Sequence, residues 1–342
     1  MLSASPFRVT VTSAGSGTRA TLQGVDVGED LTWTDPEWLA ETHEWIIESL
    51  DRAGLTLMGP IEQPHVRPWA TVLRAPGSEG TVWCKGMVAA VAHEPVAISI
   101  LARVAPDRVP RLLAADRTRR LMLTADGGTR LRDLDAPRHD PKRWMAMLRT
   151  YARLQRAAEG AATELVGAGV PDRRLAVLPD RVAELVAELR PDGMDDLVPR
   201  IAKACAELAG LRIPETIEHA DLHDAQVFVD PDGDRFFDWG DAAVAHPFLS
   251  LAVALRVLAS TVGVADDSPT VDAAIDAYLE RWSSLAPLAA LRRGAALGRA
   301  LGGASRALTW HAVAVDAPAT EKLFPGAAEE WLRDTAQILP QY

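Results

Sequence analysis

The sequence predicts an α+β fold in which a small antiparallel sheet is followed by a larger, mostly helical region. Between residues 55 and 125, Pro, Gly and β-branched residues punctuate short apolar runs, a pattern typical of hairpin-connected strands. From residue 141 onward, apolar residues recur at helical spacing over long stretches. With 342 residues, the chain is long enough for two packed regions.

Strands are predicted in the first region from their composition and from the turns between them. Residues 70–74 and 81–85 read as two strands joined by a hairpin at 76–80, where Pro and Gly favour a turn. Residues 109–114 and 121–124 read as two further strands.

Helices are predicted on both sides of this sheet. A first helix runs over 36–53, with Thr34 or Asp35 as its cap and apolar residues at helical spacing. The remaining predicted helices span 141–160, 180–189, 196–211, 248–262, 271–285 and 288–313.

The segment from His219 to Asp241 holds most of the chemical information. It reads H-A-D-L-H-D-A-Q-V-F-V, then an acidic turn, then F-F-D-W-G-D. Residues 226–229 and 236–237 read as strands, and the turn signal at 231–234 joins them into a hairpin. Such a hairpin brings its two flanks close together.

Three side chains at these flanks suit phosphoryl transfer. Asp221 is placed to accept the proton of a substrate hydroxyl, and Gln226 offers an amide oxygen five positions later. Asp238 adds a second carboxylate after the hairpin. Hard oxygen ligands of this kind suit Mg²⁺, which needs few protein ligands because it keeps several waters.

This order of residues, H-x-D-x-x-x-x-N followed by a hairpin and D-W, resembles the catalytic core of aminoglycoside phosphotransferases and related small-molecule kinases. The resemblance implies a bilobal protein-kinase-like fold that uses ATP and Mg²⁺. It also implies that Asp221 is the catalytic base and that Gln226 and Asp238 are the metal ligands. Gln226 departs from the family's Asn, since it keeps the amide oxygen but is one methylene longer. The alternative is a generic β-hairpin with surface acids.

The same resemblance implies nucleotide contacts in the first region. Lys85 ends a V-W-C-K strand, where the family has a lysine that contacts the α- and β-phosphates and pairs with a glutamate, here Glu94. Glu94 opens a predicted helix, so the alternative is an acidic residue favoured by the helix dipole. Thr124 and Ala125 lie in the expected hinge, whose backbone would bind adenine. No glycine-rich phosphate loop occurs between residues 64 and 74.

Several residues around the motif have two readings. His219 is expected to support the loop through hydrogen bonds, with a general acid as the alternative. His223 and Asp224 either line the acceptor site or cap the loop, and Asp241 either caps the following segment or fixes the catalytic loop. Trp310 either closes the acceptor pocket, as the resemblance implies, or is a buried aromatic residue of a helix.

The last predicted helix carries a periodic set of basic residues. Arg292, Arg299 and Arg306 recur every seven residues and are expected to be solvated or salt-bridged. The glycines and alanines of this helix indicate close packing against its neighbours.

Composition limits the partners and the compartment. The net charge of -11 argues against nucleic acid and is compatible with a cationic substrate such as an aminoglycoside. Two cysteines, Cys84 and Cys205, give no disulfide framework and no zinc spacing. The sequence has neither a leader-like N-terminus nor an 18-residue apolar run, so no membrane contact and a cytoplasmic location are expected. Oligomeric state is not indicated.

The function predicted from these observations is ATP- and Mg²⁺-dependent transfer of the γ-phosphate to a hydroxyl of a small molecule, with an aminoglycoside or related amino sugar favoured. The alternatives are a kinase of another small alcohol or neutral sugar, and a nucleotide-binding pseudokinase with a regulatory role. The predicted domains are an N-terminal extension at 1–54, a nucleotide-binding lobe at 55–125 and a helical lobe at 126–342.

Overall fold

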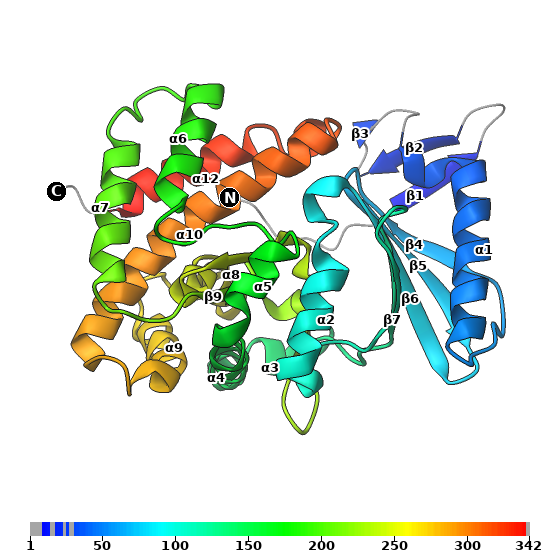
Figure 1. The fold of residues 1–342 in the computed structure, drawn as a ribbon, viewed down its shortest axis with the longest axis horizontal. Coiled ribbons are helices and arrows are strands. Elements are labelled where there is room, and N and C mark those ends of the chain that lie inside the picture. Colours follow the sequence, from blue (N-terminus) through cyan, green and yellow to red (C-terminus); the bar gives the residue numbers. More distant parts are fainter. Residues whose placement is uncertain (1–8, 14–17, 23–24, 27–30, 340–342) are drawn as a thin grey trace. The chain divides into compact units, whose positions relative to one another are not determined.

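A computed structural model of the chain describes residues 9–13, 18–22, 25–26 and 31–339. It confirms the α+β class, because a five-stranded antiparallel sheet is combined with a mostly helical remainder (Figure 1). Among the described residues, no helix is long and apolar enough to cross a membrane.

The chain forms two compact units, which we call unit 1 and unit 2. Unit 1 comprises Met1–Ala92, Arg111–Asp126 and Ala312–Gly326. Unit 2 comprises His93–Pro110, Gly127–His311 and Ala327–Tyr342. The division into domains at residues 54 and 125 stays a prediction.

Unit 1 is built on the antiparallel sheet, whose strand order is β4-β5-β6-β8-β7. The predicted hairpin joins β5 to β6, and Gly77 pairs with Gly80 at its tip. The elements of unit 1 are β1 (Val9–Ser13), β2 (Thr18–Leu22), β3 (Val25–Asp26), α1 (Pro36–Arg52), β4 (Glu62–Val66), β5 (Ala70–Gly77), β6 (Gly80–Met87), β7 (Leu112–Asp116), β8 (Leu121–Ala125) and α11 (Thr320–Leu323).

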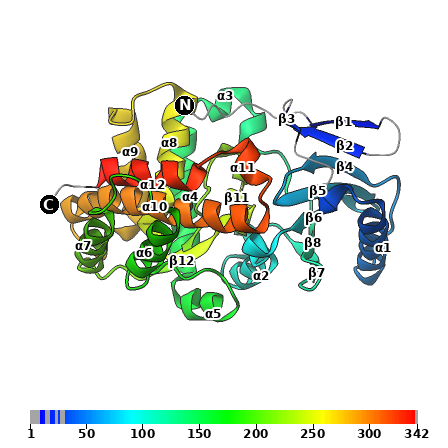
Figure 2. The same ribbon diagram turned by 90° about the horizontal axis from the view of Figure 1, so that it is seen from above.

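Helix α1 covers one face of this sheet (Figure 2). It begins after Asp35, whose carboxylate accepts the backbone N–H groups of Glu37 and Trp38 at 2.7 and 3.1 Å. Its apolar stripe is buried against Leu73 and other side chains of the sheet, so the amphipathic pattern of the sequence places the helix.

Unit 2 is mostly helical and carries two short two-stranded sheets, β9 with β12 and β10 with β11. Its helices are α2 (Glu94–Val104), α3 (Asp135–Arg138), α4 (Pro141–Ala157), α5 (Ala162–Gly167), α6 (Leu178–Leu189), α7 (Leu197–Ala209), α8 (Leu251–Val262), α9 (Pro269–Leu279), α10 (Leu288–Asp316, ending in unit 1) and α12 (Ala327–Ile338). Its strands are β9 (Thr216–Glu218), β10 (Val227–Phe228), β11 (Arg235–Phe236) and β12 (Ala243–Ala245).

The structure differs from the sequence prediction mainly at element ends. The strand predicted at 109–114 is β7, which begins only at Leu112, after Pro110, because proline has no N–H for a ladder. The helix predicted at 248–262 begins with a short 3₁₀ turn, Pro247–Ser250. Strands β4, β9 and β12 and helices α3, α5 and α11 were not predicted, because short elements give weak periodic signals. Helix α12, which has 12 residues, was not predicted either.

Helix α10 packs closely on its neighbours through a row of glycines, as its composition predicts. Gly294, Gly298 and Gly302 are four residues apart and therefore share one helix face. A Cβ atom on Gly302 would lie 2.2 Å from the carbonyl oxygen of Leu249, a distance that requires the backbone to move. On another side of the helix, α12 packs through Thr335, which bonds the carbonyl of Ala300.

We expect Gly302→Ala to destabilise the protein by about 1–3 kcal/mol, because the added methyl group overpacks the contact with Leu249. The control is Gly167→Ala at the end of α5, where a Cβ atom meets nothing within 4 Å. That change should be neutral or stabilising by up to ~1 kcal/mol. Urea unfolding of both variants measures the difference, and equal stabilities would contradict the close packing.

Candidate active site

The candidate site lies in unit 2, in the loop that leaves β9 and returns to β12. These two strands pair antiparallel, with Glu218 opposite Ala243, so the loop between them starts and ends at one place. Within the loop, residues 224–226 form a 3₁₀ turn that is capped by His223, whose Nδ1 accepts the N–H of Ala225 at 3.0 Å.

The hairpin of β10 and β11 brings the two flanks of the motif together. Val227 pairs with Phe236, and the N–H of Phe237 bonds the carbonyl of Gln226 at 3.1 Å. As a result, the side-chain nitrogen of Gln226 lies 3.3 Å from an oxygen of Asp221 and 3.1 Å from an oxygen of Asp238. The three residues predicted for catalysis and metal binding are therefore neighbours.

Two backbone conformations in the loop are uncommon for residues with a side chain. Ala220 and Asp238 have φ values of 58° and 64°, in the left-handed region. Each costs on the order of 1 kcal/mol or more relative to an ordinary conformation, and such residues concentrate at functional sites. They orient the peptide units directly beside the Asp221 carboxylate and at Asp238.

A buried set of hydrogen bonds supports the loop from behind. His219 bonds the carbonyl of Phe237 through Nε2 at 2.9 Å, and its ring centroid lies 4.7 Å from that of Trp239. Its pKa is lowered because burial disfavours the charged ring, so His219 has the predicted supporting geometry. The hydroxyl of Tyr151 accepts the N–H of His219 at 2.9 Å.

Glu94 also serves this loop. It lies at the start of α2, and its Oε1 accepts the backbone N–H of Trp239 at 3.0 Å. The carboxylate thereby holds the residue that follows Asp238. The ion pair with Lys85 stays a prediction, because Lys85 belongs to unit 1.

Asp221 is surrounded by positive charge. Arg306 Nη2 lies 3.1 Å from its Oδ1, and His223 Nε2 lies 3.5 Å from its Oδ2. Burial alone would raise the pKa of Asp221, but the charges of Arg306 and His223 outweigh burial and hold this pKa well below its usual range. The carboxylate is therefore ionised and able to accept a proton.

Asp224 supports the loop rather than reacting. It is fully buried and forms ion pairs with Arg132 at 2.8 Å and Arg138 at 3.2 Å. Burial raises its pKa, but hydrogen bonds from His223 and Arg132 outweigh this and lower the pKa below the usual range. Of the two readings from sequence, the structure places Asp224 in a structural ion-pair network.

A second buried network lies beside the start of the loop. Ser305 Oγ donates to Glu218 Oε2 at 2.8 Å and accepts from Arg173 Nη1 at 3.1 Å. Burial raises the pKa of Glu218 to about 7, even though Arg173 and Ser305 lower it. Burial likewise lowers the pKa of Arg173 to about 10.

The donor set fits a magnesium ion. Two carboxylates and one amide converge, and rotation of the Gln226 amide by 180° would present its oxygen instead of its nitrogen. Among the described residues, no group of three or more His, Cys, Asp or Glu side chains could hold a metal alone. Mg²⁺ does not need such a cage, since it is bound by one or two carboxylates together with phosphates and water.

The predicted nucleotide contacts lie in unit 1. Lys85 is on β6, paired with Val72 of β5 and Met122 of β8, so it occupies a central strand of the sheet. Thr124 and Ala125 end β8. The N–H of Ala125 bonds the carbonyl of Arg111 at 3.0 Å, so any adenine contact by Ala125 would use its carbonyl group.

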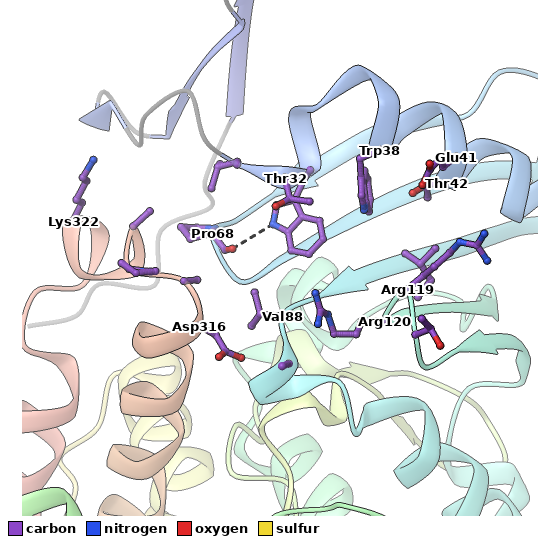
Figure 3. A pocket seen from close by; sticks show the side chains of 18 residues that line it. Thr32, Trp38, Glu41, Thr42, Pro68, Val88, Arg119, Arg120, Asp316 and Lys322 are labelled. Carbon is purple, nitrogen blue, oxygen red and sulfur yellow. Dashed lines mark hydrogen bonds between the residues drawn. The ribbon is translucent and has the colours of Figure 1, made fainter. Parts of the chain in front are cut away.

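Unit 1 also contains a cavity of about 810 Å³ that lies apart from these predicted contacts (Figure 3). Its walls come from the start of α1, the turn between β7 and β8, and residues 316–322. Trp33, which lines the cavity, donates from Nε1 to the carbonyl of Pro68 at 3.3 Å. Neither Lys85 nor Thr124 nor Ala125 lines it, so the cavity is not part of the predicted nucleotide contacts.

The fold and the site together define a small-molecule phosphotransferase with a protein-kinase-like fold. The chain matches the model of the phosphotransferase enzyme family over residues 89–291, more than half of its length, and it belongs to that family. Phosphotransferases of this family generally use ATP and a divalent metal. Among curated proteins, none matches the chain significantly.

Solved structures share the fold at low sequence identity. A macrolide 2'-phosphotransferase type I is 18% identical, with 89% of this chain and 98% of that chain covered and a TM-score of 0.55. A choline/ethanolamine kinase family protein from Mesorhizobium loti is 17% identical, with coverage of 89% and 95% and a TM-score of 0.58. Choline kinase LicA from Streptococcus pneumoniae is 12% identical, with coverage of 88% and 100% and a TM-score of 0.59. At these identities the likeness establishes the fold alone.

Sequence reasoning did not find the residues that compensate the charges of the site. The sequence predicts Arg306 only as one of a stripe of arginines that are solvated or salt-bridged. Arg292 and Arg299 do pair with exposed or half-exposed acids, but Arg306 is buried beside Asp221. The glycines of α10 were the available signal, because a tightly packed helix face buries the residues beside it.

We expect Asp224→Asn to destabilise the protein by about 3–5 kcal/mol, because it leaves two arginines without their buried partner. The matched control is Asp133→Asn, which breaks an exposed ion pair with Arg130 and should cost about 0–1 kcal/mol. Both free energies of unfolding come from urea titration at pH 7. A cost for Asp224→Asn no larger than that of the control would show that the buried network is not needed for stability.

Proposed function

We propose that the chain transfers the γ-phosphate of ATP, in the presence of Mg²⁺, to a hydroxyl group of a small molecule. The observation that carries the proposal is the convergence of Asp221 and Asp238 on the Gln226 amide nitrogen, at 3.3 and 3.1 Å. Phosphoryl transfer needs little covalent chemistry from the protein, so placement and charge are what such a cluster has to supply.

Asp221 acts as the base in this proposal. The acceptor oxygen forms its bond to the γ-phosphorus while the bond to the leaving ADP oxygen breaks, and the hydroxyl proton passes to the Asp221 carboxylate. The Asp221 carboxylate is ionised before the acceptor arrives, and its lowered pKa makes it a weak base that suits late proton transfer. Deprotonation need not be early, since the transition state is loose.

The other predicted site residues would hold the nucleotide. Gln226 and Asp238 would supply oxygen ligands to Mg²⁺, which neutralises charge on the phosphates when bound. Lys85 would contact the α- and β-phosphates with Glu94 as its partner, and the backbone at Thr124 and Ala125 would bind adenine. The hydrogen bond of Glu94 to the Trp239 N–H gives Glu94 a further role, because it steadies the residue beside Asp238.

For the acceptor we favour an aminoglycoside or related amino sugar. Helix α6 and the connection after it carry six carboxylates and two arginines: Asp180, Glu184, Glu188, Asp192, Asp195, Asp196, Arg181 and Arg190. Glu188 bonds His311, which follows Trp310 on α10, so this acidic stretch lies beside the helix that reaches Asp221. Carboxylates at that place would favour an acceptor with ammonium groups.

Two other functions have specific support. Similar folds in a macrolide 2'-phosphotransferase, a choline/ethanolamine kinase family protein and a choline kinase support other acceptors, such as macrolides and amino alcohols. A neutral sugar is the further alternative from the sequence. A nucleotide-binding pseudokinase is supported by Gln226, whose amide nitrogen rather than its oxygen faces Asp221 and Asp238. ATP binding without turnover would distinguish this second function.

We expect Asp221→Asn to lower kcat by about 10²–10⁴-fold, because an amide cannot accept the hydroxyl proton. Asp238→Ala should abolish turnover by removing a metal ligand. Activity is measured as ATP consumption with Mg²⁺ against kanamycin, glucosamine, glucose, choline and erythromycin.

The control is Asp232→Ala, an exposed acid in the turn of the same hairpin, which should leave kcat unchanged. Wild-type turnover by Asp221→Asn would remove the proton-accepting role from this residue. No ATP binding by the unmodified protein would overturn the proposed function as a whole.

We expect Gln226→Asn to keep kcat within about tenfold of the wild type, since Asn retains an amide oxygen, and Gln226→Leu to lower it by about 100-fold. The Mg²⁺ concentration at half-maximal rate reads out metal binding directly. If Gln226→Leu keeps the wild-type Mg²⁺ dependence, Gln226 is not a metal ligand.

A further inference from the structure

Two consecutive buried side chains of helix α10 contact the candidate loop and the end of β9, which leads into it. Ser305 is fully buried and donates to Glu218 at the end of β9. Arg306 is 8% exposed and reaches further into the loop. Both residues lie more than 60 positions after the loop in sequence, so only the packing of α10 brings them there.

Arg306 joins two separate parts of the loop. Its Nη2 lies 3.1 Å from Asp221 Oδ1, and its Nη1 lies 2.6 Å from Asp241 Oδ2. Asp221 is the proposed base. Asp241 ends the 3₁₀ turn Trp239–Asp241, which directly follows Asp238. One guanidinium group therefore links the segment of the base to the segment of the second metal-ligand candidate.

The chemistry of this link favours arginine over lysine. A guanidinium group is planar and permanently charged, and its two terminal nitrogens can face two carboxylates at once. The ammonium group of lysine is a single point charge and cannot bridge the two carboxylates with the same planar geometry. The Trp310 ring centroid, one helical turn further on, lies 5.3 Å from the guanidinium carbon and limits its movement.

The carboxylate of Asp221 is held at both oxygens. Oδ1 faces Arg306, while Oδ2 faces the amide of Gln226 at 3.3 Å and His223 at 3.5 Å. These contacts fix the rotation of the carboxylate about its Cβ–Cγ bond. A base must accept a proton along a defined direction, so this rotation matters for the reaction.

We propose that Arg306 is a positioning residue for phosphoryl transfer, which orients the Asp221 carboxylate and ties it to the loop of Asp238 by bridging to Asp241. The inference rests on the proposed function. It assigns a role in the reaction to a residue of the C-terminal helix that contacts neither metal nor phosphate. Because positioning acts on the transition state, its loss lowers kcat while ATP binding is retained.

The test compares variants at both ends of the bridge with a matched ion pair elsewhere. Arg306→Met and Asp241→Asn should each lower kcat by about 10–100-fold, with the KM for ATP changed by less than about twofold. Arg306→Lys should restore little of the lost kcat, because it keeps the charge without the fork. The acceptor is whichever of kanamycin, glucosamine, glucose, choline and erythromycin gives the highest wild-type turnover.

The matched control is Arg299→Met. Arg299 lies on the same helix, two turns before Arg306, and pairs with Asp266 at 2.8 Å, away from the loop. Arg299→Met should break an ion pair of the same helix yet keep the wild-type kcat per folded molecule, with the folded fraction measured by circular dichroism. If Arg306→Met does not fold, Arg306→Lys and Asp241→Asn still decide the question.

The outcomes separate the two inferences. A fall in kcat at Arg306 and Asp241 but not at Arg299 supports the positioning role. Wild-type kcat in Arg306→Met, or full recovery in Arg306→Lys, overturns it while leaving the proposed function intact. A wild-type protein without ATP-dependent turnover on any acceptor overturns the proposed function and, with it, the role of Arg306.

Discussion

The site depends on the pairing of β9 with β12, because this short ladder closes the loop that holds Asp221, Gln226 and Asp238. Glu218 and Ala243 face each other across the ladder, and the 24 positions between them are confined to one region. Within that closed loop, the hairpin of β10 and β11 sets the separation of Gln226 and Asp238. Two nested β-pairings thus place the chemistry, and the helices around them supply the buried environment.

Burial makes unpaired carboxylates in this loop costly, and arginines from other parts of unit 2 neutralise their charge. Carboxylates at Asp221, Asp224 and Asp241 are confined near one another, and unpaired charges at such burial would be costly. Arg306 forms ion pairs with Asp221 and Asp241, and Arg132 forms one with Asp224. These arginines come from α10 and from the segment before α3, so distant parts of unit 2 are needed for the loop to stay charged and ordered.

Much of this organisation could be read from the residues. The hairpin between 70–74 and 81–85, the helix capped by Asp35 and the neighbourhood of Asp221, Gln226 and Asp238 all follow from local patterns, because turn residues, caps and short hairpins are encoded within a few positions. Short elements such as α3 and α5, and the pairing of β9 with β12, could not be predicted. Helices α3 and α5 are too short to give a clear periodic signal. The pairing of β9 with β12 joins strands that are separated by 24 positions in the sequence.

The sequence by itself determined the class of fold, the chemical types of the site residues and their order along the chain, since these depend on local propensity and spacing. It did not determine the partners of the catalytic carboxylate. Arg306 looked like its neighbours Arg292 and Arg299, and a seven-residue period cannot tell a buried arginine from an exposed one. Only the packing of the glycine face of α10 against Leu249 and Phe248 carried Arg306 to Asp221, because ion pairing across 85 positions is set by tertiary contacts.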